Sequence, residues 1–478
     1  MKVTSLRAPR CGRFGWNVLA VLVLTGRAAA QDPIADLIDP PLSILEAPLE
    51  RASRLLLDLY PSDSGVPSIG QGRTNQSSRE SSPLLPDGEH LLNRLLGIER
   101  SPVRIYGWIQ NSYTGNPSNP ANGLNFGVTP NDLANQWMGN QYYLIFEQPL
   151  EQVDRVNFGF RFDNLFGNDW QFTHMHGLFD NTFRLNSVAG YDPAQFYANV
   201  HLPILTDGGL DVRGGRWYTI AGYEGVPALS RSLLSVPYMF NYGQPFTHFG
   251  VLTTLNVSER FKLFNGAVNG WDRFINRNYN WGYLGGFSWD SKDERTHLAF
   301  TCVWGPNQFP NFLPVDTQLF PTGYVNIPSL AGLPNPGYAR NDRTLFTTVL
   351  SRQWSNELLQ VFEFDVGWER AIPGLGSNGQ NGLPASDQWY GIGTWFLYQV
   401  SEPLALVWRS EWFRNVAGSR TGLPGDFYEV TLGMVIKPMP RVWFRPEVRL
   451  DWAHPNRPFD NGNSNRQVTI ACDLIVNF

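Results

Sequence analysis

The sequence predicts an all-β protein: a transmembrane, antiparallel, up-and-down β-barrel of about 16 strands, with a partly helical or disordered N-terminal extension. Three observations predict this fold. Apolar and polar residues alternate with a period of two in many segments after about Val103. Short and long connections between these segments alternate, and no apolar run after the first 30 residues is long enough for a membrane helix. A soluble β-sheet shares the first feature, so the other two decide between the classes.

Residues 1–30 have the pattern of a secretory signal peptide. Four basic residues precede an apolar stretch at 16–24, and three alanines follow at 28–30. The stretch is far shorter than the roughly 20 residues that a membrane helix needs. We therefore expect export and removal of this segment. Its removal leaves 32 basic against 42 acidic residues, a net charge near −10, so nucleic acid is not an expected partner.

Residues 31–100 are predicted to be a periplasmic extension and linker. Prolines 40, 41 and 48 interrupt a helical spacing, residues 61–82 are rich in Ser, Gly and Pro, and residues 89–97 fit one short helix. The remaining residues, 101–478, are assigned to the outer-membrane barrel.

The strand pattern is clearest where aromatic residues alternate with polar ones. VNFGFRF, residues 156–162, places Val and Phe on one face and Asn, Gly and Arg on the other. The pattern recurs at 195–203, 358–368, 428–436 and 441–452. About 16 such segments can be counted, and an even number returns the chain to the side on which it started. The very regular last segment, RQVTIACDLIVNF, is therefore predicted to pair with the first strand and close the barrel.

The connections alternate in length along the chain. Short turns on the periplasmic side and long loops outside are typical of outer-membrane barrels. A β-propeller would group strands in fours, and no blade-length repeat is present. The predicted tight turns are 149–154, 206–209, 257–260, 291–294, 354–357, 401–403 and 438–440, and the long loops are 114–138, 165–192, 219–245, 306–342, 371–387 and 453–465.

Trp and Tyr residues collect near the predicted strand ends, as expected for aromatic girdles at the two membrane interfaces. Ordinary core aromatics are the alternative. The candidates are Tyr218, Trp271, Trp281, Trp304, Trp368, Trp389 and Trp452. Outside the signal peptide, Cys302 and Cys472 lie on apolar strand faces and are predicted to be two packed thiols rather than a disulfide.

Four segments resemble OmpL-like β-barrel porins of the outer membrane. They are residues 103–117, 158–170, 213–228 and 240–252, and the similarity spans about 103–478. The resemblance implies a channel in the outer membrane, and the terminal Phe478 resembles the assembly signal of such barrels. It supplies no catalytic motif and no cofactor, so we expect neither enzyme activity nor a bound cofactor.

If the apolar strand faces contact lipid, the opposite faces line the lumen. About 16 strands make a barrel wide enough for a water-filled channel, through which small hydrophilic solutes could diffuse passively. Rows of charged side chains along the lumen would set the ion preference of the channel. Arginine can also hold fixed pairs with carboxylates across such a wall. The pore-lining candidates are Arg161, Asp163, Arg213, Glu363, Asp365, Arg409, Glu411, Glu429, Arg445, Glu447, Arg449 and Asp451.

The third long loop, 219–245, has two alternative positions. In general porins a loop of this rank folds inward and narrows the pore, so by resemblance Glu224 and Arg231 are candidates for the constriction. An external cap is the other possibility. Porins of this size are commonly trimers, which makes a homotrimer an expected assembly.

Two other classes of function stay open. A structural protein could link the outer membrane to the periplasm through residues 31–100. A barrel enzyme such as a lipase is the other class. An active site could also use Glu363 and Asp365, whose spacing of about 7 Å along a strand falls in the range of paired glycosidase carboxylates. His174 and His176 offer two metal ligands without a third, and GLGSNG at 374–379 matches a dinucleotide fingerprint without the helix that it needs.

Overall fold

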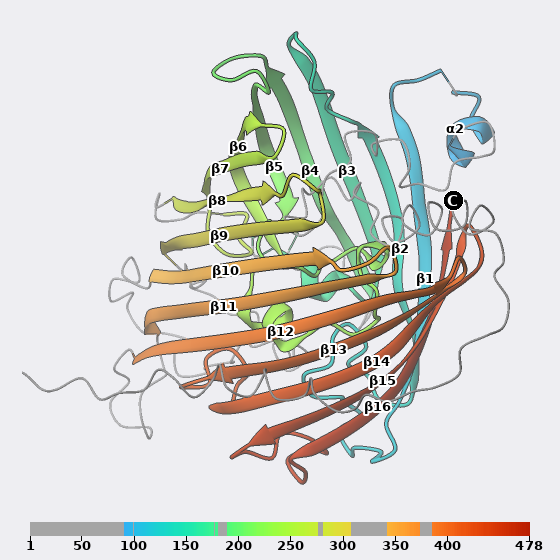
Figure 1. The fold of residues 1–478 in the computed structure, drawn as a ribbon. Helices are drawn as coiled ribbons and strands as arrows, with labels where there is room; N and C mark the ends of the chain where they lie inside the picture. Colours follow the sequence, from blue (N-terminus) through green and yellow to red (C-terminus); the bar gives the residue numbers. More distant parts are fainter. Residues whose placement is uncertain are drawn as a thin grey trace, which may run out of the picture. The chain divides into compact units, whose positions relative to one another are not determined.

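The computed structural model describes residues 90–98, 100–175, 177–179, 189–275, 281–306, 342–372 and 385–478. Within these residues, sixteen antiparallel strands form one closed barrel (Figure 1). Every strand pairs with its neighbours in sequence, and β16 pairs with β1. The all-β barrel class and the strand number predicted from the sequence are confirmed.

All strands except β7, which has 8 residues, have the roughly nine or more residues that a tilted membrane strand needs. Their bounds are β1 (Arg104–Gly115), β2 (Gln136–Gln148), β3 (Asn157–Gly167), β4 (Gly190–Leu202), β5 (Leu210–Tyr218), β6 (Thr247–Ser258), β7 (Phe261–Val268), β8 (Gly282–Asp290), β9 (Thr296–Pro306), β10 (Asp342–Gln353), β11 (Leu358–Ile372), β12 (Ala385–Ser401), β13 (Leu404–Asn415), β14 (Gly425–Met439), β15 (Val442–His454) and β16 (Arg466–Asn477).

Short helical turns interrupt the β structure. They are the α-helices α2 (Leu91–Leu95) and α3 (Trp170–Thr173), the 3-10 turn η3 (Ala228–Ser230) and the π-helical turn η4 (Met239–Gly243). None of the helices in the described ranges is long and apolar enough to span a membrane.

The two faces of a strand differ as the alternating sequence predicts. In β16, Ile470 is 54% exposed and Leu474 is 47% exposed, whereas Thr469 and Asp473 are each 1% exposed. Because successive side chains point to opposite faces, the exposed apolar row covers the outside of the barrel and the polar row faces the lumen.

The last strand closes the barrel through the C-terminal residue. The Phe478 amide donates to the Gly107 carbonyl at 2.9 Å, and the Gly107 amide donates to the Phe478 carbonyl at 3.0 Å. A Cβ at residue 107 would lie 2.0 Å from the Tyr143 carbonyl oxygen and 3.0 Å from the Phe478 ring. Only glycine leaves room for this approach of β1, β2 and the terminal phenylalanine.

Residues 90–98 are fixed to the start of β1. Asn93 donates to the Val103 carbonyl at 2.7 Å and accepts the Ile105 amide at 2.8 Å, and the His90 ring stacks on Tyr106. The short helix expected at 89–97 is present as α2. The signal peptide and the rest of the predicted extension before residue 90 lie outside the described residues.

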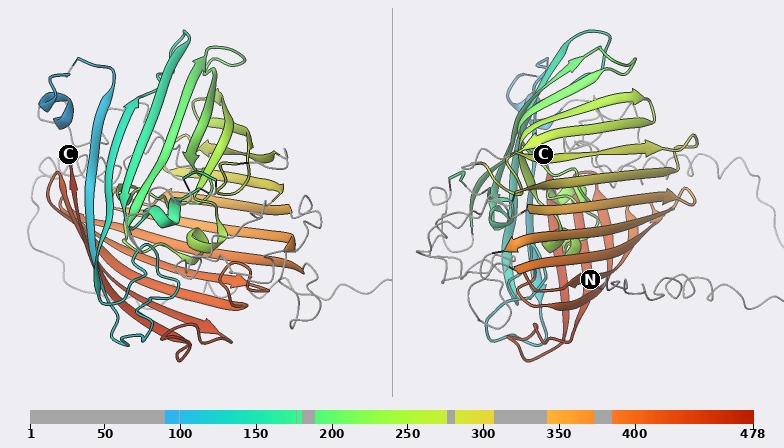
Figure 2. Two further views of the ribbon diagram at one scale, coloured as in Figure 1. Left: turned by 180° about the vertical axis from the view of Figure 1, so that it is seen from behind. Right: turned by 90° about the vertical axis from the view of Figure 1, so that its left-hand side faces the viewer.

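The connection between β5 and β6 does not extend away from the barrel. Figures 1 and 2 show it inside the ring of strands, near β11–β13. We call residues 219–246 the inner segment. All of its residues except Gly225 are buried. The inner segment therefore fills part of the lumen instead of capping the barrel from outside.

Candidate functional site

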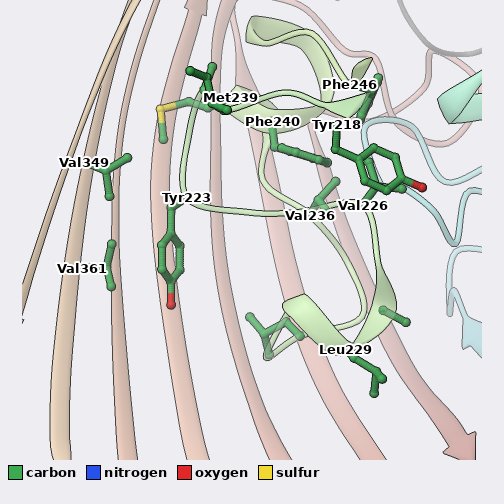
Figure 3. Packing of buried hydrophobic residues seen from close by; sticks show 14 of the residues in the cluster. Tyr218, Tyr223, Val226, Leu229, Val236, Met239, Phe240, Phe246, Val349 and Val361 are labelled. Carbon is green, nitrogen blue, oxygen red and sulfur yellow. The ribbon is translucent and has the colours of Figure 1, made fainter. Parts of the chain in front are cut away.

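The inner segment is suited to a buried, irregular path. Prolines 227, 237 and 245 interrupt any continuous strand or helix, and most of the remaining residues are apolar or small. Figure 3 shows Tyr223 and Met239 in the buried apolar cluster that also contains Val349 of β10 and Val361 of β11. Such a path buries backbone amides and carbonyls, which then need partners inside the barrel.

Carboxylates of the wall accept the amides of the inner segment in consecutive pairs. Glu447 accepts the amides of Leu234 at 2.8 Å and Ser235 at 3.1 Å. Glu411 accepts the amides of Tyr238 and Met239, each at 2.5 Å, one on each carboxylate oxygen. These two carboxylates therefore fix residues 234–239 against β13 and β15.

Arginines of the same wall donate to the carbonyls of the inner segment. Arg445 Nη1 donates to the Ala228 carbonyl at 2.9 Å and to the Arg231 carbonyl at 2.5 Å. Arg409 Nη1 donates to the Ser235 carbonyl at 2.5 Å, and Arg449 Nη1 donates to the Val236 carbonyl at 2.7 Å.

Each of these arginines also has a carboxylate partner in the wall. The shortest N–O distances are 2.6 Å for Arg409 with Glu429, 2.5 Å for Arg445 with Asp473, and 2.8 Å for Arg449 with Asp451. Asp451 additionally accepts the Tyr238 hydroxyl at 2.9 Å. Wall charges and inner segment thus form one connected network, which we call the wall clamp: Arg409, Glu411, Glu429, Arg445, Glu447, Arg449, Asp451 and Asp473.

The two ends of the inner segment are held on β11 and β12. Glu363 accepts the Tyr223 amide at 3.1 Å, and the Gln244 side chain donates to both Glu363 and Asp365. Trp389 Nε1 donates to the Gly243 carbonyl at 3.0 Å. On β12, a Cβ at Gly391 or Gly393 would lie within 3 Å of the Met239 side chain, so these glycines make room for it.

A second charged cluster lies on β2–β5. Arg161 pairs with Asp163 at 2.6 Å and with Glu147 at 3.0 Å. Asp163 also accepts the Tyr143 hydroxyl at 2.6 Å and the Gln195 amide at 2.7 Å. This cluster braces the wall on the other side of β1 from the wall clamp, and none of these contacts involves the inner segment.

The twelve pore-lining candidates lie on two groups of strands, β11–β15 and β3–β5. Eleven of them are at most 4% exposed, and Arg213 is half-buried with its guanidinium 4.3 Å from the centre of the Tyr197 ring. Contact of these residues with a permeating solute stays a prediction. The nine on β11–β15 are Glu363, Asp365, Arg409, Glu411, Glu429, Arg445, Glu447, Arg449 and Asp451, and the three on β3 and β5 are Arg161, Asp163 and Arg213.

The sequence of the barrel matches a known family over its whole length. Residues 102–478 match the family described as "Putative beta-barrel porin-2, OmpL-like". The chain belongs to this porin family. It is therefore an outer-membrane channel for passive diffusion, and the resemblance seen in the sequence is confirmed. Among curated proteins there is no significant sequence match.

Solved outer-membrane channels share the fold at low sequence identity. The anion-selective porin from Comamonas acidovorans is 9% identical over 79% of this chain and 99% of its own, with a TM-score of 0.51. The channel DcaP of Acinetobacter baumannii has 9% identity, 79% and 97% coverage and a TM-score of 0.49. OmpT of Vibrio cholerae has 10% identity, 79% and 97% coverage and a TM-score of 0.47. At such identities the likeness concerns the fold alone.

The two constriction candidates of the porin, Glu224 and Arg231, both lie in the inner segment and are 6% and 3% exposed. Glu224 accepts Trp395 Nε1 at 2.9 Å and lies 3.7 Å from Arg409 Nη1. Burial raises the pKa of Glu224, and Arg409 and Arg231 oppose this rise. Burial lowers the pKa of Arg231, with Asp169 acting in the opposite direction.

The aromatic girdle is confirmed at only some of the predicted positions. Trp281 and Trp304 are 55% and 49% exposed, as a girdle requires. Tyr218, Trp271 and Trp389 are at most 6% exposed, so their assignment to the girdle is wrong. The reason is that chain segments inside the barrel cover the ends of these strands, as the bond from Trp389 to Gly243 illustrates.

The other sequence candidates have no catalytic arrangement in the described ranges. The carboxylates of Glu363 and Asp365 are occupied by the inner segment, and Cys302 and Cys472 are free, half-buried thiols, as expected. His176 and residues 374–379 lie outside the described ranges. Sequence reasoning missed Glu147 and Asp473, whose only signal was their place on the polar faces of strands.

Proposed function

We propose that this porin lets small hydrophilic solutes and ions diffuse passively through a constriction formed by the inner segment. The observation that supports this most is the wall clamp, which fixes a buried chain segment across the inside of a sixteen-stranded barrel. Barrels of this size have an interior wider than their own side chains can fill. A fixed segment narrows such an interior without any energy source.

The inner segment contacts strands at several positions around the inside of the barrel. Besides the wall clamp on β13–β16, the Ala228 amide donates to the Gln141 side chain of β2 at 2.9 Å, and the Gln141 side chain donates to the Val226 carbonyl at 2.9 Å. The Thr301 hydroxyl of β9 donates to the Ile220 carbonyl at 3.2 Å. Contacts in several directions favour a rigid constriction of constant size.

The proposal includes the surroundings of the barrel. Residues 1–30 act as a signal peptide, residues 31–100 lie in the periplasm at the short-turn side, and the apolar outer faces contact outer-membrane lipid. Three copies assemble as a homotrimer. The size of the barrel, at which porins are commonly trimers, supports the last point.

Liposome swelling tests the constriction directly. Purified protein in liposomes should pass monosaccharides readily and exclude tetrasaccharides, because the inner segment limits the cross-section. Empty liposomes and liposomes with heat-unfolded protein are the controls. Absence of swelling in monosaccharides, with correctly folded protein, would favour the structural alternative, and equal swelling in all sugars would show that the inner segment does not narrow the pore.

A further inference from the structure

The arginines of the wall clamp have their charges paired within the protein. Arg409, Arg445 and Arg449 each lie within 2.8 Å of a carboxylate oxygen and donate a further bond to a carbonyl of the inner segment. Such bidentate and shared contacts use the donors of a guanidinium for holding the fold. A solute anion would have to break these contacts in order to bind there.

Arg231 of the inner segment differs from these arginines. It is 3% exposed, yet no carboxylate of the described residues lies within ion-pair distance of it. Its Nε and Nη2 atoms, and the hydroxyl of the adjacent Ser232, have no hydrogen-bond partner in the part of the chain that the structure describes. A buried, unpaired guanidinium is costly, which is why most buried charges in proteins have a counterion.

The carboxylates that act on the charge of Arg231 are hydrogen-bonded to other groups. Asp169, Glu224 and Asp473 all act on the charge of Arg231. Asp169 accepts side-chain amides of Asn140 at 3.0 Å and Gln141 at 2.8 Å. Glu224 accepts Trp395, and Asp473 accepts Arg445 together with Gln110 at 2.6 Å. These carboxylates partly stabilise the positive charge of Arg231 from a distance, but none of them forms an ion pair with it.

The position of Arg231 is fixed from both sides. Its carbonyl accepts Arg445 Nη1 at 2.5 Å, and the amides of Leu234 and Ser235 are held by Glu447. The backbone that carries the Arg231 side chain is therefore already held in place when a ligand arrives. Preorganisation of this kind lowers the entropic cost of binding.

We propose that Arg231 is an anion-binding site in the constriction and that it takes the carboxylate group of a small solute. Nε–H and Nη2–H lie side by side on one edge of the guanidinium, and this edge matches the two oxygens of a carboxylate. The Ser232 hydroxyl is a further donor on the same stretch. This inference rests on the proposed function, since the solute must enter the constriction to reach the site.

Acetate is the probe for two measurements on the full-length mature protein. In planar bilayers with KCl, potassium acetate should reduce the wild-type chloride current in a concentration-dependent way. Arg231→Gln should weaken this block about tenfold or more, because a charge-assisted bidentate contact is lost. Arg231→Lys keeps the positive charge but not the two adjacent donors, so it should also weaken the acetate block. Arg352→Gln, at an exposed ion pair with Asp293, is the matched control and should behave as wild type.

The second measurement does not depend on conduction. Saturation-transfer NMR on detergent-solubilised protein should show acetate binding to the wild type and its loss in Arg231→Gln, with heat-modifiable gel mobility confirming that each variant is folded. Acetate binding or block that is unchanged in Arg231→Gln, or absent from the wild type, would overturn the site. Arg231-dependent binding in a protein that is silent in bilayers would support the site and count against the proposed function.

Discussion

Arg445 shows how one side chain can stabilise both the barrel wall and the chain segment inside it. It pairs with Asp473 of β16 and donates to the carbonyls of Ala228 and Arg231. A planar guanidinium with five N–H donors can make both sets of contacts. Replacement of Arg445 and Arg449 by glutamate would therefore reverse two charges and also detach the inner segment. Such a double variant changes pore shape together with ion selectivity.

Asp132 gives the residue-scale prediction. It lies in the β1–β2 connection, is 4% exposed, and its Oδ1 has no partner in the described ranges. Burial raises the pKa of Asp132 to about 7, and nearby Asp169 acts in the same direction. Because the folded-state pKa is above the unfolded value near 4, the folded protein binds more protons in this interval, and stability should fall as the pH rises from about 4 to about 7.

Urea unfolding at several pH values checks this dependence. Asp132→Asn should remove most of the Asp132 contribution and flatten the change in unfolding free energy between pH 4 and pH 7. The exposed turn residue Asp207 supplies the control Asp207→Asn, which should follow the wild type. An Asp132→Asn profile as steep as the wild-type profile would mean that Asp132 is already charged or hydrated in the folded barrel.

Sequence alternation identified the inner faces correctly but not the partners of each charge. Arg445 and Glu447 were expected on a lumen face, and in the structure both side chains are buried inside the barrel. Asp473 pairs with Arg445 from 28 residues away, and a register shift of one residue would have moved it to the lipid side. Glu411 and Glu447 bind backbone amides, which leave no pattern of side chains to recognise.

At the scale of elements, barrel closure depends on the contact between β1 and the end of β16. Gly107→Ala should destabilise the barrel by about 1–3 kcal/mol or more, because the new Cβ would lie 2.0 Å from the Tyr143 carbonyl oxygen and against the Phe478 ring. Gly214→Ala is the matched control, since a Cβ there meets no atom within 4 Å. Urea midpoints and heat-modifiable mobility should separate the two variants, and equal stability would show that closure does not need glycine at 107.

The outer strand faces supply a second element-scale prediction. Leu432 is 59% exposed in the middle of β14, so Leu432→Arg should cost about 2–4 kcal/mol in the bilayer. Val257→Arg, at the end of β6 and 41% exposed, should cost only about 0–1 kcal/mol. Similar losses of folded barrel in both variants would contradict a lipid-facing midplane at Leu432.

The inner face of β14 is tightly packed around Thr431. Thr431 is completely buried, and its hydroxyl donates to Glu429 at 2.5 Å and accepts Arg409 Nη2 at 3.4 Å. An arginine there would overpack the wall and add a charge beside Arg409, so a large loss of stability is expected.

At the scale of the whole molecule, the periodicity of the sequence was sufficient to predict the barrel. The chain segment inside the barrel could be located only from the structure. Alternating apolar and polar residues, together with alternating turn lengths, predicted about sixteen strands and closure of the barrel by the last one, and both are confirmed. The inner segment has no period of its own, and its place follows from contacts with residues about 170–220 positions later in the chain. The girdle prediction was wrong at Trp271 and Trp389 for the same reason, since segments inside the barrel bury them.

Single-channel recording in planar lipid bilayers tests the central claim most directly. Wild-type protein should give stepwise conductance of one constant size, because the inner segment is clamped. The double variant Glu411→Ala/Glu447→Ala removes the acceptors of four backbone amides and should give larger, noisier steps, while Glu402→Ala in an exposed turn should match the wild type. Folded wild-type protein that gives no steps, or a double variant with unchanged conductance, would contradict a diffusion channel narrowed by the inner segment.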